Sequence, residues 1–176
     1  MEHFVTNGDF DDFAPQGGES EKAAMSPLAA LHARRAEIVS ELYLDIKVPR
    51  WDNPEIYVRF RPASAIKLSN SLDKRRKTNQ SDWAILANAD MLIDACIGVY
   101  AVLDGEHDEK FSLRKNDPNG SWTTFDADLA EALGVTERKA TAVVQALFLT
   151  EGDLIDTANK LFAWSGIAGD EADATF

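Results

Sequence analysis

The chain has few cysteines, few long apolar runs and a shortage of positive charge. Cys96 is the only cysteine among 176 residues, so the chain can form no intrachain disulfide and no zinc site built from several cysteines. Its apolar surroundings predict a buried helix face, where cysteine usually acts as a small apolar side chain rather than a reactive thiol. We therefore expect no redox chemistry at Cys96.

No apolar run is long enough to cross a bilayer. The longest, residues 83–102, is interrupted by Asn88, Asp90 and Asp94, whereas a membrane span needs roughly 20 apolar residues. The first residues also lack the basic and apolar parts of a secretory signal. These two absences predict a protein that does not enter the membrane and is made in the cytoplasm.

Positive charge is scarce and negative charge gathers at the two ends. The 30 acidic and 18 basic residues give a net charge of −12. Residues 1–25 hold six acidic residues against Lys22, and residues 167–176 hold three acidic residues and no basic one. Both segments predict disordered acidic tails. Because this charge repels phosphate backbones, we do not expect nucleic acid as a partner.

The middle of the chain predicts an α+β, mostly helical fold. Ser26 and Pro27 fit the start of a first helix. Residues 42–48 and 56–61 alternate between apolar and polar side chains, which predicts a β-hairpin around a loop at 49–54. Residues 64–77, with Ile66 and Leu72 inward, and residues 82–102 have helical spacing. The second of these is the most regular helical pattern in the chain.

The remainder predicts a short strand followed by three short helices. Residues 111–114 fit a third strand, and Asp126, Thr136 and Thr150 fit the starts of helices, with stops at Gly134 and Gly166. We therefore expect an α+β core at 26–103 and a helical subdomain at 126–166. Connecting loops at 104–125 would join the two.

No residue pattern indicates catalysis or a cofactor. Asp104, Glu106 and Asp108 alternate as calcium ligands do, but the glycine and the glutamate that complete a calcium loop are missing. The three histidines have no metal-ligand spacing, and Asp90 and Asp94 have no nucleophile beside them. We expect no enzyme activity, no metal and no cofactor.

Two surfaces are candidates for binding a partner. Residues 74–77 form a basic cluster that could contact RNA or an acidic protein, although a solvated helix end is the favoured interpretation. The outer face of the hairpin combines arginine with aromatic residues, as interfaces often do, in Tyr43, Trp51, Tyr57, Arg59 and Arg61. A strand surface partly covered by another helix explains this second pattern equally well.

Several separate stretches resemble the tail assembly chaperones of long-tailed actinobacterial phages. They are residues 44–51, 58–62, 87–96, 125–130, 146–154 and 161–166. The resemblance implies a non-enzymatic assembly factor in the host cytoplasm, absent from the mature virion. It would bind and solubilise the tape measure protein, help to recruit the tail tube protein, and could self-associate. A permanent tail or head-completion protein and an RNA-binding regulator remain as alternatives.

Overall fold

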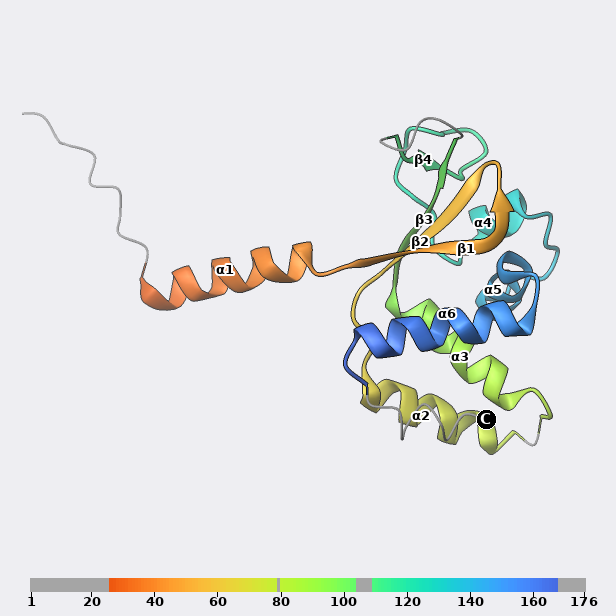
Figure 1. Cartoon of the computed structure of the whole chain (residues 1–176), viewed down its shortest axis with the longest axis horizontal. Coiled ribbons are helices and arrows are strands. Elements are labelled where there is room, and N and C mark those ends of the chain that lie inside the picture. The colour runs from red at the N-terminus through yellow and green to blue at the C-terminus, as the bar shows by residue number, and fades with distance from the viewer. Residues whose placement is uncertain (1–25, 79, 104–108, 168–176) are drawn as a thin grey trace, which may run out of the picture. The chain divides into compact units, whose positions relative to one another are not determined.

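A computed structural model describes residues 26–78, 80–103 and 109–167. These residues form six helices and four strands (Figure 1), which confirms the predicted α+β, mostly helical class. In chain order they are α1 (Pro27–Glu41), β1 (Leu44–Asp52), β2 (Glu55–Phe60), α2 (Ala65–Arg76), α3 (Trp83–Ala95), β3 (Cys96–Val102), β4 (Phe111–Ser112), α4 (Ala127–Ala132), α5 (Ala140–Phe148) and α6 (Glu151–Trp164). The chain divides into two units, Met1–Val39 and Ser40–Phe176.

Helix α1 belongs almost entirely to the first unit. It begins as the sequence predicts, with Pro27 in the first position and the Ser26 hydroxyl accepting a hydrogen bond from the Ala29 amide at 3.2 Å. None of its residues is buried, and Leu28 and Leu31 are more than 60% exposed. Its stability therefore comes from its own backbone, which is marginal for an isolated helix of this length.

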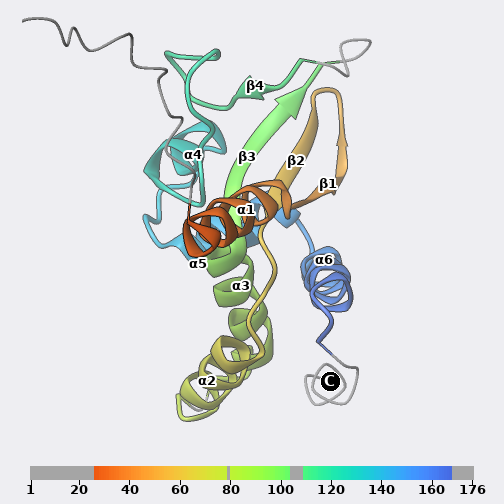
Figure 2. The same ribbon diagram turned by 90° about the vertical axis from the view of Figure 1, so that its left-hand side faces the viewer.

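The second unit is built on a four-stranded antiparallel sheet in the order β1-β2-β3-β4 (Figure 2). The predicted hairpin is confirmed, because its alternation places one apolar set inward: Ile46, Val48, Ile56, Val58 and Phe60 are buried. The predicted loop at 49–54 is too long. β1 runs through an irregularity after Lys47 to Asp52, and only Asn53 and Pro54, joined by a cis peptide bond, make the turn.

The predicted helix over residues 82–102 is confirmed as far as Ala95 and wrong beyond it. Helix α3 ends at Ala95 and β3 begins at the next residue, Cys96, with no loop between them. Cys96 therefore lies at the start of a strand rather than on a helix face. The Arg61 amide, one residue after β2, donates to the Ala95 carbonyl at 2.9 Å and fixes this junction.

The sequence pattern did not predict strand β3, because both faces of this strand are covered. It pairs with β2 on one side and β4 on the other, and all its residues from Gly98 to Val102 are buried. A strand of this kind reads as a continuous apolar run, which periodicity cannot distinguish from a buried helix.

The helices of the second unit and the sheet form a single apolar core, in which α2 packs chiefly on α3. In α2 the inward residues are Leu68 and Leu72, whereas Ile66, which we expected inward, is 75% exposed. Helices α5 and α6 contact both α3 and, through their other side, β1. The helical segment predicted at 126–166 thus shares its core with the sheet.

The ends of the last three helices agree in part with the predicted caps. Asp126 accepts from the backbone amides at the start of α4, and Thr150 accepts from the Asp153 amide at the start of α6. Gly134 and Gly166 follow α4 and α6 with positive φ, as expected. Thr136 begins no helix, because α5 starts only at Ala140.

Several predictions concern residues outside the described ranges. The acidic tails at 1–25 and 168–176 lie there, as does the acidic turn with Asp104, Glu106 and Asp108. None of the described helices has the length and apolar character needed to cross a bilayer.

Candidate functional site

Leu149, between α5 and α6, combines two unfavourable features. Its φ is +60°, a region that favours glycine, and its apolar side chain is 54% exposed. Helices α4 and α6 end with glycines in the corresponding positive-φ region, Gly134 and Gly166. A leucine here costs about 1–3 kcal/mol in backbone strain, so its side chain is the candidate reason for its presence.

The turn that carries Leu149 is fastened to the irregular part of β1. The Trp51 indole N–H donates to the Leu147 carbonyl at 2.8 Å. Next to it, Arg50 (φ +69°) donates through Nε to the Asp153 carboxylate at 2.6 Å. Asp153 is also tied to the Thr150 hydroxyl, and the contacts with Arg50 and Thr150 lower its pKa. These bonds fix the direction in which Leu149 projects.

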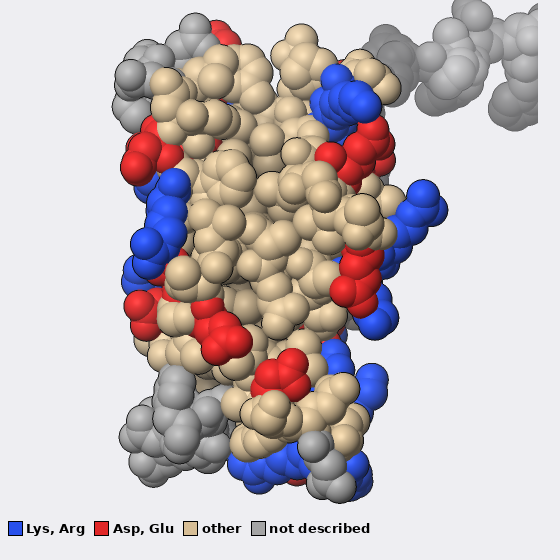
Figure 3. Space-filling view, turned by 90° about the vertical axis from the view of Figure 1, so that its right-hand side faces the viewer, with Lys and Arg blue, Asp and Glu red and all other residues tan. Residues whose placement is uncertain are grey.

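Leu149 lies at the end of a helix surface without charge. No residue from Ala140 to Thr150 is charged, and the same holds for Trp83 to Ala89 at the start of α3, which packs against α5. Figure 3 shows the side on which α5 lies: uncharged side chains fill the centre, and lysine, arginine, aspartate and glutamate lie along the margins. A shallow depression beside Leu149 is lined by Gln145, Leu149, Thr150, Glu151 and Leu154.

We call this surface the α5 face: Thr141, Ala142, Gln145, Ala146 and Leu149. All of these side chains are partly or fully exposed. An uncharged surface with one projecting leucine suits the apolar side of another helix.

The outer face of the hairpin brings together three of the five predicted partner-binding residues. The Arg59 guanidinium binds the Asp45 carboxylate through two hydrogen bonds of 2.7 Å and lies 3.6 Å from the centre of the Tyr43 ring. Tyr57 follows on the same face and donates its hydroxyl proton to Glu55 at 2.9 Å. The arginine is therefore fully engaged within the chain.

The other two predicted residues lie elsewhere. Trp51 points to the α5–α6 turn, as described above. Arg61 lies beyond the end of β2, where its guanidinium donates to the backbone carbonyl of Asp94. The five residues therefore do not form one surface.

Sequence reasoning missed three members of the outer-face cluster. Tyr100 of β3 stacks on Tyr57 at 5.5 Å between ring centres and contacts Trp122 at 4.5 Å. The Lys110 ammonium lies 5.0 Å from the Tyr100 ring centre. Trp122 could not be placed because its contacts lie on a strand misread as a helix. This cluster covers the middle of the sheet's outer face, but the covering residue, Trp122, lies outside any helix, whereas the alternative interpretation expected a covering helix.

The electrostatics of the cluster favour a structural role. Burial alone would raise the pKa of Asp45, but the Arg59 guanidinium and the Lys110 ammonium together lower it. Burial and the nearby Asp45 carboxylate raise the pKa of the Tyr100 hydroxyl. Asp45 therefore stays ionised and Tyr100 neutral around pH 7, so neither is poised to exchange protons there.

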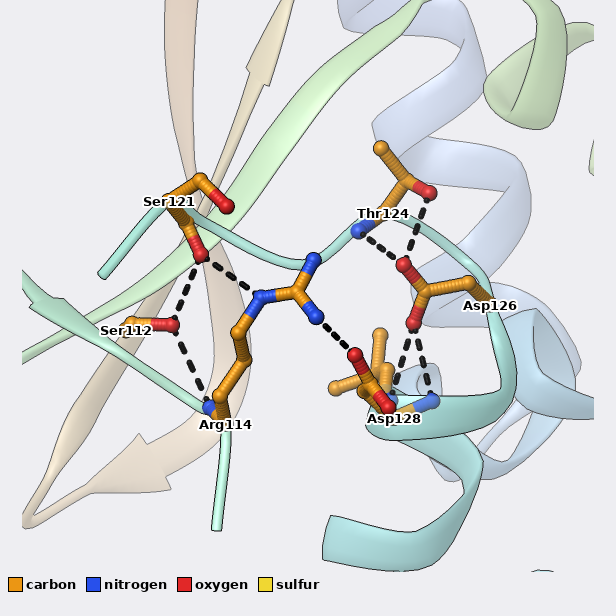
Figure 4. A network of polar contacts seen from close by, with 7 residues as sticks. Ser112, Arg114, Ser121, Thr124, Asp126 and Asp128 are labelled. Carbon is orange, nitrogen blue, oxygen red and sulfur yellow. Dashed lines mark hydrogen bonds and ion pairs between the residues drawn. The ribbon is translucent and has the colours of Figure 1, made fainter. Parts of the chain in front are cut away.

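A second polar network joins the segment after β4 to α4 (Figure 4). The Arg114 side chain donates to the Ser121 carbonyl at 2.9 Å and also binds the Asp128 carboxylate. Asp126 meanwhile accepts from the amides of Asp128 and Leu129, both at 3.1 Å, and from Thr124. The depression beside Arg114 is lined by two basic and three acidic side chains, so its excess of negative charge is small.

The basic cluster at 74–77 is partly neutralised within the chain. Arg75 binds the Asp90 carboxylate through Nε at 2.8 Å and Nη2 at 2.7 Å, and the Arg76 guanidinium lies 4.8 Å from the Trp83 ring centre. Among the described residues, no three His, Cys, Asp or Glu side chains gather as metal ligands would. Burial raises the pKa of the Cys96 thiol to about 12, which keeps it protonated.

Comparison with known proteins gives no match: no family model, no curated protein and no solved structure corresponds to the chain.

Proposed function

We propose that the protein is a phage tail assembly chaperone that binds the tape measure protein through the α5 face. The resemblance noted in the sequence supplies the class of protein, and Leu149 is the observation that supports a client-binding surface. In this proposal the protein acts in the host cytoplasm, helps to recruit the tail tube protein and leaves before the virion is complete.

The strained, exposed leucine supports binding rather than folding. Glycine at position 149 would relieve the backbone strain that the positive φ imposes on leucine. Leucine adds an apolar side chain that is already half in water, so it contributes little to the core. A long client helix with an apolar stripe would cover this side chain together with the uncharged residues of α5.

Co-expression with the tape measure protein tests the proposal. The unmodified chain should raise the soluble fraction of the client and co-purify with it. The L149G variant should lose most of this effect, while its own free energy of unfolding changes by no more than about 1 kcal/mol, because relief of strain offsets the added freedom of the unfolded chain.

Ile66→Ala is the matched control. Ile66 is also an exposed apolar side chain, but it lies on α2 rather than on the α5 face. Its removal should leave client solubility unchanged. A soluble client with L149G, or no effect of the unmodified chain, would contradict the proposal. Stoichiometric protein in purified particles would instead favour a permanent virion component.

A further inference from the structure

Strand β1 forms one edge of the sheet. The strand order gives it a single hydrogen-bonded neighbour, β2. Figure 2 draws it as the outermost strand on its side. Among the described residues, the backbone hydrogen bonds outside helices and paired strands include none from residues 44–48. Alternate peptide groups of this segment therefore point away from β2 and can pair with another strand.

We propose that residues 44–48 pair antiparallel with the same residues of a second copy of this chain, about a two-fold axis through Ile46. The pairing segment is bounded by the fold. Pro49 has no amide proton to donate, and Arg50 with its positive φ turns the strand away. Five extended residues remain, and their pairing with β2 is regular as far as Lys47.

The charge pattern selects this register. Pairing about Ile46 places Asp45 of each copy directly opposite Lys47 of the other, on the outer face, and Leu44 opposite Val48 on the inner face. A shift by one residue would put apolar side chains on the wrong face. Pairing about Asp45 or Lys47 keeps the faces but opposes two like charges.

Both charged groups are accessible for the pairing. The Asp45 side chain is 23% exposed and already pairs with Arg59 and Lys110. The Lys47 side chain is 39% exposed and already pairs with Glu55 and Asp52. A second lysine would therefore join an existing charge network rather than desolvate an isolated ion. On the inner face Val48 is fully buried within its own copy, so the outer-face charge pairs and the backbone hydrogen bonds supply the contact between copies.

Analytical ultracentrifugation of the full chain over a range of concentrations tests the proposal. A five-residue edge buries little surface, so the dimer is expected only in concentrated protein. K47E opposes two carboxylates twice per dimer and should raise the dissociation constant about tenfold or more. K67E on α2 makes the same charge change away from β1 and should leave it unchanged.

Mixing two variants gives the sharper result. K47E and D45K should each remain monomeric alone but dimerise when mixed, because both cross-strand pairs then have opposite charges. Dimers that persist in K47E, or an unmodified chain that stays monomeric at millimolar concentration, would overturn the proposal.

If D45K does not fold, amide hydrogen exchange on the unmodified chain tests the same pairing. Protection of amides within residues 44–48 should rise with protein concentration, while amides of β3 stay unchanged. Protection independent of concentration would overturn the pairing. Because these tests need no client, their failure is distinct from failure of the chaperone proposal.

Discussion

Gly98 allows Trp122 to pack closely against β3. A Cβ at this position would stand 2.9 Å from Cε3 and 3.0 Å from Cβ of Trp122, closer than packed carbon atoms approach. We expect G98A to destabilise the second unit by about 1–3 kcal/mol through displacement of the indole. Urea unfolding followed by tryptophan fluorescence measures this change.

The matched control is G152A in the first turn of α6. Nothing lies within 4 Å of a Cβ built there, and the φ of Gly152 is not positive. Alanine should be neutral or slightly stabilising at this site. Equal stabilities of G98A and the unmodified chain would show that Trp122 is not packed on β3.

Asp90 makes the second unit sensitive to acid. Burial raises the pKa of its carboxyl, but hydrogen bonds from Arg75 and Ser71 outweigh burial and lower the pKa below its ordinary value of 3.8. Its contribution to stability is therefore complete above the unfolded-state pKa and disappears as the pH falls through the lower, folded-state value.

We expect D90N to cost about 1 kcal/mol at pH 7, since the pair is partly exposed. The difference from the unmodified chain should shrink toward zero as the carboxyl becomes protonated in both states. Denaturant titrations between pH 7 and pH 2 measure it. A difference that stayed constant with pH would contradict the assigned ion pair.

At the scale of the helix, Thr150 and Thr136 form a natural comparison. The sequence predicts a cap at both, but only Thr150 begins a helix, α6, where its hydroxyl accepts from the Asp153 amide at 3.2 Å. T150A should destabilise the second unit by about 1 kcal/mol, whereas T136A should change nothing measurable. Thermal unfolding of both variants measures these changes. An equal loss of stability in T136A would support the prediction of a helix that begins at Thr136.

A helix or strand is well predicted from the sequence where one of its faces is exposed to solvent, and poorly predicted where both faces are buried. The hairpin could be predicted because Ile46 and Val48 alternate with charged residues. The switch from α3 to β3 could not, because the chain stays without charge across it, from Ala95 to Val102. The sequence could not predict the α5 face either, because the exposure of Leu149 depends on a turn that is held by Arg50 and Trp51, about a hundred residues earlier.

At the scale of the whole molecule, the sheet and the C-terminal helices should unfold together, because they share one core. All four tryptophans lie in the second unit, so fluorescence reports that unit alone, whereas circular dichroism also includes α1. We expect a single fluorescence transition. Deleting residues 26–39 should leave its midpoint unchanged, because no residue of α1 is buried. Two transitions would show that residues 126–166 fold separately.

The direct junction of α3 with β3 makes the chain unevenly tolerant of changes in length. One residue inserted between Ala95 and Cys96 would either turn α3 by about 100° against its neighbours or slide β3 by one position and reverse its faces. Residues 136–139 are exposed and belong to no helix or strand, so an insertion there disturbs neither. Related chains that differ in length are therefore expected to differ before α5 and to keep the step from Ala95 to Cys96 free of insertions.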